Sequence, residues 1–516
     1  MKNNEVYLYN KKTNKTSDFK MWMAFPGIYS FSLSSLGYLW MYKCIDEIDG
    51  VNIERICSDT ESTLFKKEDI NLVGFSFSFD MDFLKIFSII DKYNLPLKTS
   101  EREENHPLIF AGGPVVTANP LPYSDFFDFI IIGDGEDVNV EVVKLCKANK
   151  NKSKKEVLKL LSQIEGIYVP SIKQNKVKKL TKTLSECIYT PIISENAFFK
   201  NTFILEMSRG CYNRCGFCIA SYLNLPLRFM PYDELIEIID FGLSYTNKIA
   251  LLGAQVCAHP HFENVLKYIY SKIQNGQKIE MSISSLRVDA ITPDVIKTFV
   301  AAGQKNITLA IEAGSERLRK VINKNLTEEQ ILNAVDICIE NGLKGLKFYG
   351  MLGLPTETQE DINSLIQLAK KLKKKNKGFN LSFGFSTFVP KAHTPFQWCG
   401  REETRSLEDK ISYLKKEFHK LGISANFSSP KWDYYQAVLS RGDSSLGNYL
   451  IDVYKKGGKL GAFKSAAKEN KIDTDYFALV NYPLDKELPW NFIEVCPGVE
   501  FLTTEHNRLL NHSHVS

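Results

Sequence analysis

The sequence predicts an α/β protein with a doubly wound N-terminal domain, a partial (β/α)6 barrel of the TIM type and a small, mostly helical C-terminal domain. Three observations predict this fold. The chain has 516 residues, 44% hydrophobic and 24% charged, which suits about two to four globular domains. Short apolar runs alternate with helical patterns up to about residue 390. The pattern loosens after about residue 400, so we place the domains at 1–195, 196–400 and 401–516.

The N-terminal domain begins with an uncharged run over residues 21–42 that is long enough to span a membrane. Pro26, Gly27 and four serines interrupt this run, so we expect a strand, a turn and a buried helix, and no membrane segment. Strand-like runs follow at 71–77, 108–111 and 127–132. The last two lead into glycine-rich turns, where a doubly wound sheet presents its ligand-binding loops.

The barrel is predicted by six strand-helix repeats. The strand-like runs lie at 202–207, 248–252, 279–284, 306–311, 346–351 and 381–389. Helix starts lie between them: Thr292 precedes a proline, and Thr327 forms a capping box with Gln330. Because barrels of this kind carry their active sites on the loops after the strands, we expect the chemistry there.

Charge and cysteine usage restrict the function classes. The formal net charge is only +5, which does not favour a dedicated nucleic-acid binder. Lysine-rich stretches at 144–182 and 370–377 are most simply solvated helix faces and helix ends. The polar first twenty residues lack the apolar core of a secretory signal, and the eleven cysteines form no dense framework. We therefore expect a cytoplasmic protein.

The loop after the first barrel strand holds Cys211, Cys215 and Cys218. Three thiolates at this spacing can bind three irons of a [4Fe-4S] cluster, and one iron stays open because no fourth cysteine lies near. The alternative is a structural zinc completed by Cys257, His259 or His261, in a binding module without enzymatic activity. A structural zinc site favours two cysteine pairs, whereas this loop has no partner pair.

This loop resembles the Cys-x3-Cys-x2-Cys hallmark of the radical S-adenosylmethionine (SAM) superfamily, with the usual aromatic residue at Phe217. The resemblance covers about residues 196–400. It implies an oxygen-sensitive enzyme in which SAM chelates the open iron and is cleaved reductively to a 5′-deoxyadenosyl radical. It also implies an electron donor of the flavodoxin or ferredoxin type.

The same resemblance implies candidate SAM contacts after three barrel strands, the second to the fourth. Gly253 and Ala254, followed by Gln255, stand where many members carry Gly-Gly-Glu. Ser284 and Arg287 follow the third strand, where ribose and carboxylate contacts usually lie; ordinary surface residues are an equal alternative. Glu312 ends the fourth strand and resembles a SAM-contacting position.

The N-terminal region is similar to that of a radical SAM subgroup with a cobalamin-binding-like domain. The matching marks are the turns at 112–114 and 133–136, and the similarity extends to residues 284–358 and 390–398. A cobalt-ligating histidine would lie in an Asp-x-His-x-x-Gly loop, and His106, the single histidine before residue 190, lies in another context. Cobalamin without a histidine ligand therefore stays open, and in that version a methyl group is transferred to the substrate.

Several residues carry competing interpretations. Cys44, Cys57 and Cys146 could form a second cluster, as in methylthiotransferases, but their helical and strand-like contexts favour ordinary burial. Cys399 and Cys496 lie in predicted loops and could face the substrate. His393, just beyond the sixth strand, could contact the substrate or only pack the loop. The sequence does not specify the substrate.

Overall fold

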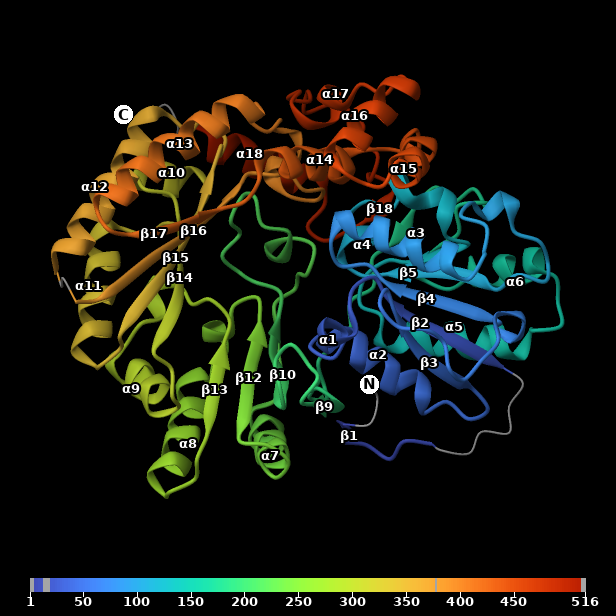
Figure 1. The fold of residues 1–516 in the computed structure, drawn as a ribbon, viewed down its shortest axis with the longest axis horizontal. Coiled ribbons are helices and arrows are strands. Elements are labelled where there is room, and N and C mark those ends of the chain that lie inside the picture. Colours follow the sequence, from blue (N-terminus) through green and yellow to red (C-terminus); the bar gives the residue numbers. More distant parts are fainter. Residues whose placement is uncertain (1–3, 13–18, 376–377, 512–516) are drawn as a thin grey trace.

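The computed structural model describes residues 4–12, 19–375 and 378–511. Two sheet-based parts face each other across the molecule, the N-terminal domain (blue) and the barrel (green to orange), and C-terminal helices extend over both (Figure 1). The predicted α/β class with largely parallel sheets is confirmed.

The N-terminal domain is a six-stranded sheet in the order β3-β2-β4-β5-β6-β7, parallel except for β7. Its strands are β2 (Lys20–Phe25), β3 (Asn52–Cys57), β4 (Leu72–Ser76), β5 (Leu108–Gly112), β6 (Phe129–Ile131) and β7 (Ile167–Tyr168). Its helices are α1 (Tyr29–Ser32), α2 (Leu36–Asp46), α3 (Phe83–Lys92), α4 (Pro114–Ala118), α5 (Glu136–Ala148) and α6 (Lys154–Leu161). The strand order reverses between β2 and β4, and such switch points are where doubly wound sheets bind ligands.

The uncharged run at 21–42 forms β2, α1 and α2, as the prediction of a strand, a turn and a buried helix required. Trp22 of β2 is buried, Leu39 of α2 is buried in the core of the N-terminal sheet, and Trp40 of α2 is buried in the core of the barrel. Within residues 4–12, 19–375 and 378–511, no helix combines the length and the hydropathy needed to cross a bilayer.

The barrel strands are β10 (Thr202–Arg209), β12 (Lys248–Gly253), β13 (Glu280–Ile283), β14 (Asn306–Glu312), β15 (Gly345–Leu352), β16 (Asn380–Thr387) and β17 (Ser424–Phe427). The covering helices are α7 (Tyr232–Leu243), α8 (Phe262–Gln274), α9 (Pro293–Ala301), α10 (Glu316–Val321), α11 (Glu328–Glu340), α12 (Gln359–Lys375) and α13 (Thr404–Lys420). All six predicted strands form, and Thr327 and Gln330 form the predicted capping box of α11.

The barrel is open and consists of two sheets. The first, β11-β10-β12-β13, includes the short strand β11 (Arg228–Phe229), and the second is β14-β15-β16-β17. A parallel bridge between Leu286 and Leu309 joins them. The second sheet runs past residue 400, because β17 pairs in parallel with β16.

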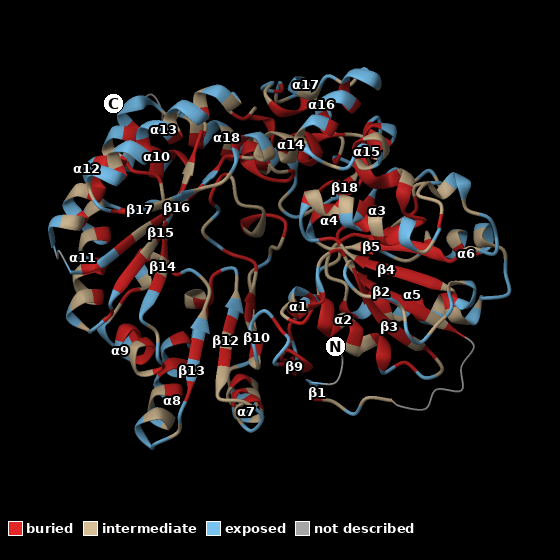
Figure 2. Ribbon diagram, viewed as in Figure 1, coloured by how far each residue is buried: buried red, intermediate tan, exposed pale blue. Residues whose placement is uncertain are grey.

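The C-terminal part contains α14 (Pro430–Arg441), α15 (Leu446–Lys455), α16 (Leu460–Glu469), α17 (Thr474–Ala478) and α18 (Val499–Asn511). Short strand pairs join distant segments: β1 (Glu5–Tyr7) with β9 (Ile192–Ser194), and β8 (Val177–Lys178) with β18 (Ile493–Glu494). We expected these helices to pack on the barrel. They also cover the N-terminal domain, where the rings of Phe83 and Phe463 lie 6.2 Å apart and those of Phe87 and Tyr454 5.8 Å apart. Buried residues follow the strands of the N-terminal sheet and the inner helix faces, whereas β13 of the barrel is largely exposed (Figure 2).

Candidate functional site

The cysteine loop begins directly after β10, at the carboxyl end of the first barrel strand. Gly210 has φ +88°, and a Cβ there would lie 2.5 Å from the carbonyl oxygen of Asn224, so only glycine fits this turn. Arg214 also adopts a left-handed conformation, with φ +49°. These two turns fold the loop back on itself, and its three cysteines lie at the end of the barrel where active sites form.

Hydrogen bonds attach the loop to the segment after α10. The amide of Gly216 donates to the carbonyl of Ile322 at 3.1 Å. The side-chain amide of Asn323 donates to the carbonyl of Arg214 at 3.1 Å, and the Tyr222 hydroxyl donates to that same carbonyl at 2.7 Å. The loop geometry is therefore held from two sides of the barrel mouth.

Cys211 and Cys215 are buried, each 7% exposed, and Cys218 is half-buried. The Cys211 thiol donates a hydrogen bond to Oε1 of Gln255 at 3.2 Å. Burial raises the pKa of Cys215 to about 12, although Lys324 partly opposes this shift. Burial also raises the pKa of the Cys218 thiol. These thiols become stable thiolates only beside strong positive charge, which the irons of a cluster supply, so the donor set fits a [4Fe-4S] cluster.

Glu312 lies at the end of β14, where the pairing with β15 shifts by one residue. Its φ of +65° is uncommon for a residue other than glycine and turns the side chain out of the strand. Oε1 of Glu312 pairs with Nζ of Lys324 at 3.2 Å, and both side chains are largely buried. Lys324 also acts electrostatically on Cys215, so this ion pair stands beside the cysteine loop.

The other predicted SAM contacts line the same mouth. The Ser284 hydroxyl donates to the carbonyl of Gly253 at 3.3 Å, while Ala254 is exposed. Arg287 pairs with Asp289 at 2.8 Å. One of its nitrogens also donates to the Lys324 carbonyl at 3.4 Å. The structure thus brings the residues after β12, β13 and β14 towards the cysteine loop.

Phe217 takes a different position from its neighbours in the loop. It packs, half-buried, against an apolar cluster that includes Leu354, Phe388 and Phe396. Cys399 is buried in this cluster, and burial raises its thiol pKa to about 12. Cys496 is exposed.

The predicted zinc alternative finds little support in the local geometry. Nε2 of His259 lies 2.9 Å from the Met230 carbonyl, and its Nδ1 accepts from the amide of His261 at 3.1 Å, so both ring nitrogens are engaged. Among the described residues, no group of three or more His, Cys, Asp or Glu side chains converges as a single metal ion requires. The sulfurs of cluster cysteines lie farther apart than the ligands of one ion, because each binds a different iron of the same cube.

The remaining sequence candidates are His393 and three cysteines of the N-terminal domain. His393 is buried, and its Nε2 lies 3.1 Å from the Ala118 carbonyl of the N-terminal domain. Burial lowers its pKa to about 4, so the ring is neutral near pH 7. Cys57 and Cys146 are buried in the core of the N-terminal sheet and Cys44 packs against the barrel core. Ordinary burial therefore describes these three cysteines.

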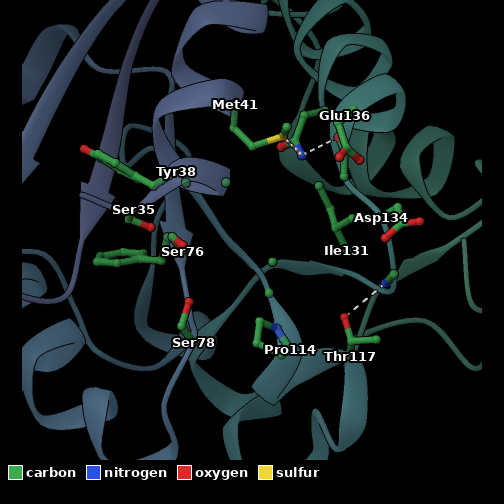
Figure 3. Close-up of a pocket in the computed structure, with 18 of the residues that line it drawn as sticks. Ser35, Tyr38, Met41, Ser76, Ser78, Pro114, Thr117, Ile131, Asp134 and Glu136 are labelled. Carbon is green, nitrogen blue, oxygen red and sulfur yellow. Dashed lines mark hydrogen bonds between the residues drawn. The ribbon is translucent and has the colours of Figure 1, made fainter. Parts of the chain in front are cut away.

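A cavity of about 400 Å³ lies at the carboxyl ends of β2, β4, β5 and β6 (Figure 3). The barrel closes part of it through Glu206, Arg209, Leu223 and Asn224. Gly37 forms part of the wall, and a Cβ built there would meet no protein atom within 4 Å. This glycine therefore leaves space that a larger side chain would fill. No histidine lines the cavity among the described residues.

Sequence reasoning missed two residues at the cysteine loop, Lys324 and Asn323. Both lie in a short turn after α10, and Asn323 has a φ of +59°. An asparagine-rich turn could have been predicted from the Asn-Lys-Asn sequence. Nothing in the sequence places that turn against a loop more than one hundred residues away.

Two family models match the chain. The model described as "Radical SAM proteins, N-terminal" matches residues 37–170, and the model of the radical SAM superfamily matches residues 205–369. An uncharacterized protein of Methanocaldococcus jannaschii is 33% identical over 75% of this chain and 85% of its own length. An uncharacterized methyltransferase of Pyrococcus horikoshii is 24% identical over 63% of this chain and 69% of its own length.

A tRNA-2-methylthio-N(6)-dimethylallyladenosine synthase of Carboxydothermus hydrogenoformans is 25% identical over 49% of this chain and 58% of its length. Among solved structures, the methyltransferase TsrM from Kitasatospora setae, with cobalamin and a [4Fe-4S] cluster bound, matches with a TM-score of 0.49 and 13% identity. That match covers 72% of this chain and 75% of TsrM.

The two family models and the extended match to the Methanocaldococcus jannaschii protein do not favour the zinc-stapled binding module. The chain belongs to the radical SAM superfamily, and it is an enzyme whose cofactors are a [4Fe-4S] cluster and S-adenosylmethionine.

Proposed function

We propose that Cys211, Cys215 and Cys218 bind the [4Fe-4S] cluster and leave one iron for SAM. The observation that carries this proposal is a set of three mostly buried thiols on one loop at the carboxyl end of β10. When bound, the cluster and SAM supply a one-electron reductive cleavage that yields a 5′-deoxyadenosyl radical. Phe217 supports the loop from the apolar side.

We assign SAM binding to the residues after the next three strands. The Glu312 carboxylate suits the SAM amino group, and Arg287 suits the SAM carboxylate, because charge-assisted hydrogen bonds are the strong ones. Lys324 holds Glu312 and adds positive charge beside Cys215. Gly253, Ala254 and Ser284 form the remaining wall, where backbone carbonyls accept hydrogen bonds.

Anaerobic reconstitution of the purified chain tests this assignment. We expect about four irons and four sulfides per chain, and formation of 5′-deoxyadenosine that requires both SAM and a strong reductant. One zinc per chain, without SAM cleavage under the same conditions, would overturn the proposal.

We further propose that the cavity at the carboxyl ends of the N-terminal sheet binds cobalamin without a histidine ligand. Three observations support this. The cavity lies at the switch point of a doubly wound sheet, it opens between that sheet and the barrel, and Gly37 keeps its wall free of side chains. Bound cobalamin would supply a methyl group, so the reaction is methyl transfer to a substrate radical. The Pyrococcus horikoshii relative named as a methyltransferase is in line with this reaction.

Equilibrium dialysis with hydroxocobalamin tests the second cofactor. We expect one cobalamin per chain at saturation, with no shift of its visible spectrum towards that of histidine-ligated cobalt. If no cobalamin is retained, the reaction depends on the deoxyadenosyl radical alone, and the methyl-transfer proposal fails.

Radical SAM enzymes need an electron donor, and we propose one of the flavodoxin or ferredoxin type. We retain a cytoplasmic location as a proposal, because all eleven cysteines are free thiols, as a reducing compartment requires. We also propose three functional units, at 1–195, 196–427 and 428–516. The barrel unit ends later than the predicted residue 400, because β17 extends its second sheet and α13 connects β17 to it.

A further inference from the structure

Arg209 connects the cysteine loop to the cavity of the N-terminal domain. It is the last residue of β10 and precedes Cys211 by two positions. Its guanidinium pairs with Asp134 at 3.0 Å, with Glu136 at 2.7 Å and with Glu206 at 2.7 Å. Asp134 and Glu136 belong to the glycine-rich turn after β6, and both line the cavity. One side chain therefore joins the two proposed cofactor sites.

This link is largely shielded from solvent. The Arg209 side chain is 16% exposed, and those of Asp134 and Glu136 are 13% and 7% exposed. Burial opposes ionisation of Asp134, but Arg209 and Arg228 outweigh it and lower its pKa. Charges that are shielded from water interact more strongly than surface charges. A change in the position or charge of Asp134 or Glu136 therefore alters the electrostatic energy of Arg209.

Glu136 has acceptor capacity left over. Its Oε1 is bound to Arg209, whereas its Oε2 is shielded from solvent and has no hydrogen-bond partner among the described residues. A shielded carboxylate oxygen without a partner is costly. In Figure 3, Glu136 and Asp134 lie on one side of the cavity, with Ser35 and Ser76 on the other. Glu136 thus lines the cavity and also has a carboxylate oxygen without a partner among the described residues.

We propose that Glu136 and Arg209 link the two sites. A molecule in the cavity donates an N–H or O–H hydrogen bond to the unpartnered oxygen of Glu136. Glu136 then holds Arg209 in place, and Arg209 holds the cysteine loop that follows it. Arg209 is thus a positioning residue. The inference rests on the proposed second cofactor, whose peripheral amide groups are donors of the required kind. Since binding linkage is reciprocal, loading the cysteine loop must in turn tighten binding in the cavity.

Hydrogen exchange of the cluster-loaded chain, with and without saturating hydroxocobalamin, tests the link. In the wild type, cobalamin should slow exchange in a peptide covering residues 208–218 by at least about fivefold, the lower end of typical coupling between sites. Glu136→Met keeps the length of the side chain and removes both oxygens, so this protection should disappear even when the cavity is saturated. Glu141→Met makes the same change at an exposed position of α5 and should leave the protection intact.

The possible results distinguish a failure of the proposed link from a failure of the cobalamin proposal. If wild-type chain binds hydroxocobalamin but exchange over 208–218 stays unchanged, the link is wrong and the cofactor proposal stands. If wild-type chain binds no hydroxocobalamin, both are overturned. If Glu136→Met does not fold, the wild type alone decides. The dissociation constant of the wild-type chain for hydroxocobalamin should fall at least about fivefold when the cluster is present. Equal dissociation constants with and without the cluster would overturn the link.

Discussion

The barrel and the N-terminal domain use the same architecture in different ways. Both place loops at the carboxyl ends of parallel strands, and these loops meet where the two parts face each other (Figure 1). In the barrel, one loop of eight residues holds all three proposed cluster ligands. In the N-terminal domain, the cavity wall is assembled from segments between residues 21 and 179. The comparison shows that the ligands of a cluster can lie close together in the sequence. The wall of a cofactor cavity, in contrast, is assembled from distant segments by the topology of the sheet.

The largest effect is expected from substitutions in the cysteine loop. Cys215→Ser removes one of three thiolates from the proposed cluster, so the chain should neither retain the cluster nor cleave SAM. Cys338→Ala changes a cysteine buried in the barrel core and should keep both properties. Iron analysis and 5′-deoxyadenosine formation measure the difference. Normal SAM cleavage by Cys215→Ser would contradict the assignment of this ligand.

The second largest effect is expected at the cavity of the N-terminal domain. Gly37 is the second residue of α2, and Gly37→Leu places a side chain in empty cavity space. We expect hydroxocobalamin affinity to fall by about 100-fold or more, equivalent to about 3 kcal/mol.

The matched control for this change is Gly461→Leu. Gly461 is the second residue of α16, and a Cβ there also meets no protein atom within 4 Å. Both variants should keep or raise the melting temperature, because leucine favours helix over glycine. Equal cobalamin affinity in the two variants would exclude this cavity as the binding site.

A smaller effect is expected at the SAM contacts. Glu312→Gln removes the charge proposed to bind the SAM amino group and leaves Lys324 without its ion-pair partner. SAM affinity should fall by roughly tenfold or more, because a hydrogen bond to a charged group contributes about 1.5–3 kcal/mol. Glu329→Gln, at an exposed position of α11, serves as control. Isothermal titration with SAM on the cluster-loaded chain measures both, and unchanged affinity would remove Glu312 from the site.

The smallest effect concerns stability and pH at the contact between the two parts. The pKa of His393 is about 4 in the folded chain, compared with 6.5 for the free side chain. The unfolded chain therefore binds the proton more readily, and folding stability falls as the pH drops from about 6.5 towards 4. This histidine should account for a loss of about 1 kcal/mol between about pH 7 and pH 5.5.

Asparagine tolerates the φ of +58° at position 393, so His393→Asn isolates this effect. Urea unfolding at the two pH values should show a smaller pH dependence for the variant than for the wild type. An identical pH dependence would mean that His393 is protonated equally in the folded and unfolded chains.

Periodicity and turn chemistry predicted most of the fold, because barrel strands such as 202–207 and 306–311 are rich in apolar residues and are separated by clear helix starts. They missed β17, since Ser424–Phe427 is a four-residue strand without an apolar run and is set by pairing with β16. The cysteine loop was predictable from spacing. The contacts of Lys324 and Arg209 were not, because each depends on side chains brought together from distant segments.

Electron paramagnetic resonance of the reduced, reconstituted chain tests the central claim most directly. If three cysteines hold the cluster and the fourth iron is open, adding SAM must change the spectrum of the reduced cluster, because SAM becomes a ligand of that iron. A spectrum that is the same with and without saturating SAM would contradict the open iron, and with it the proposed reaction.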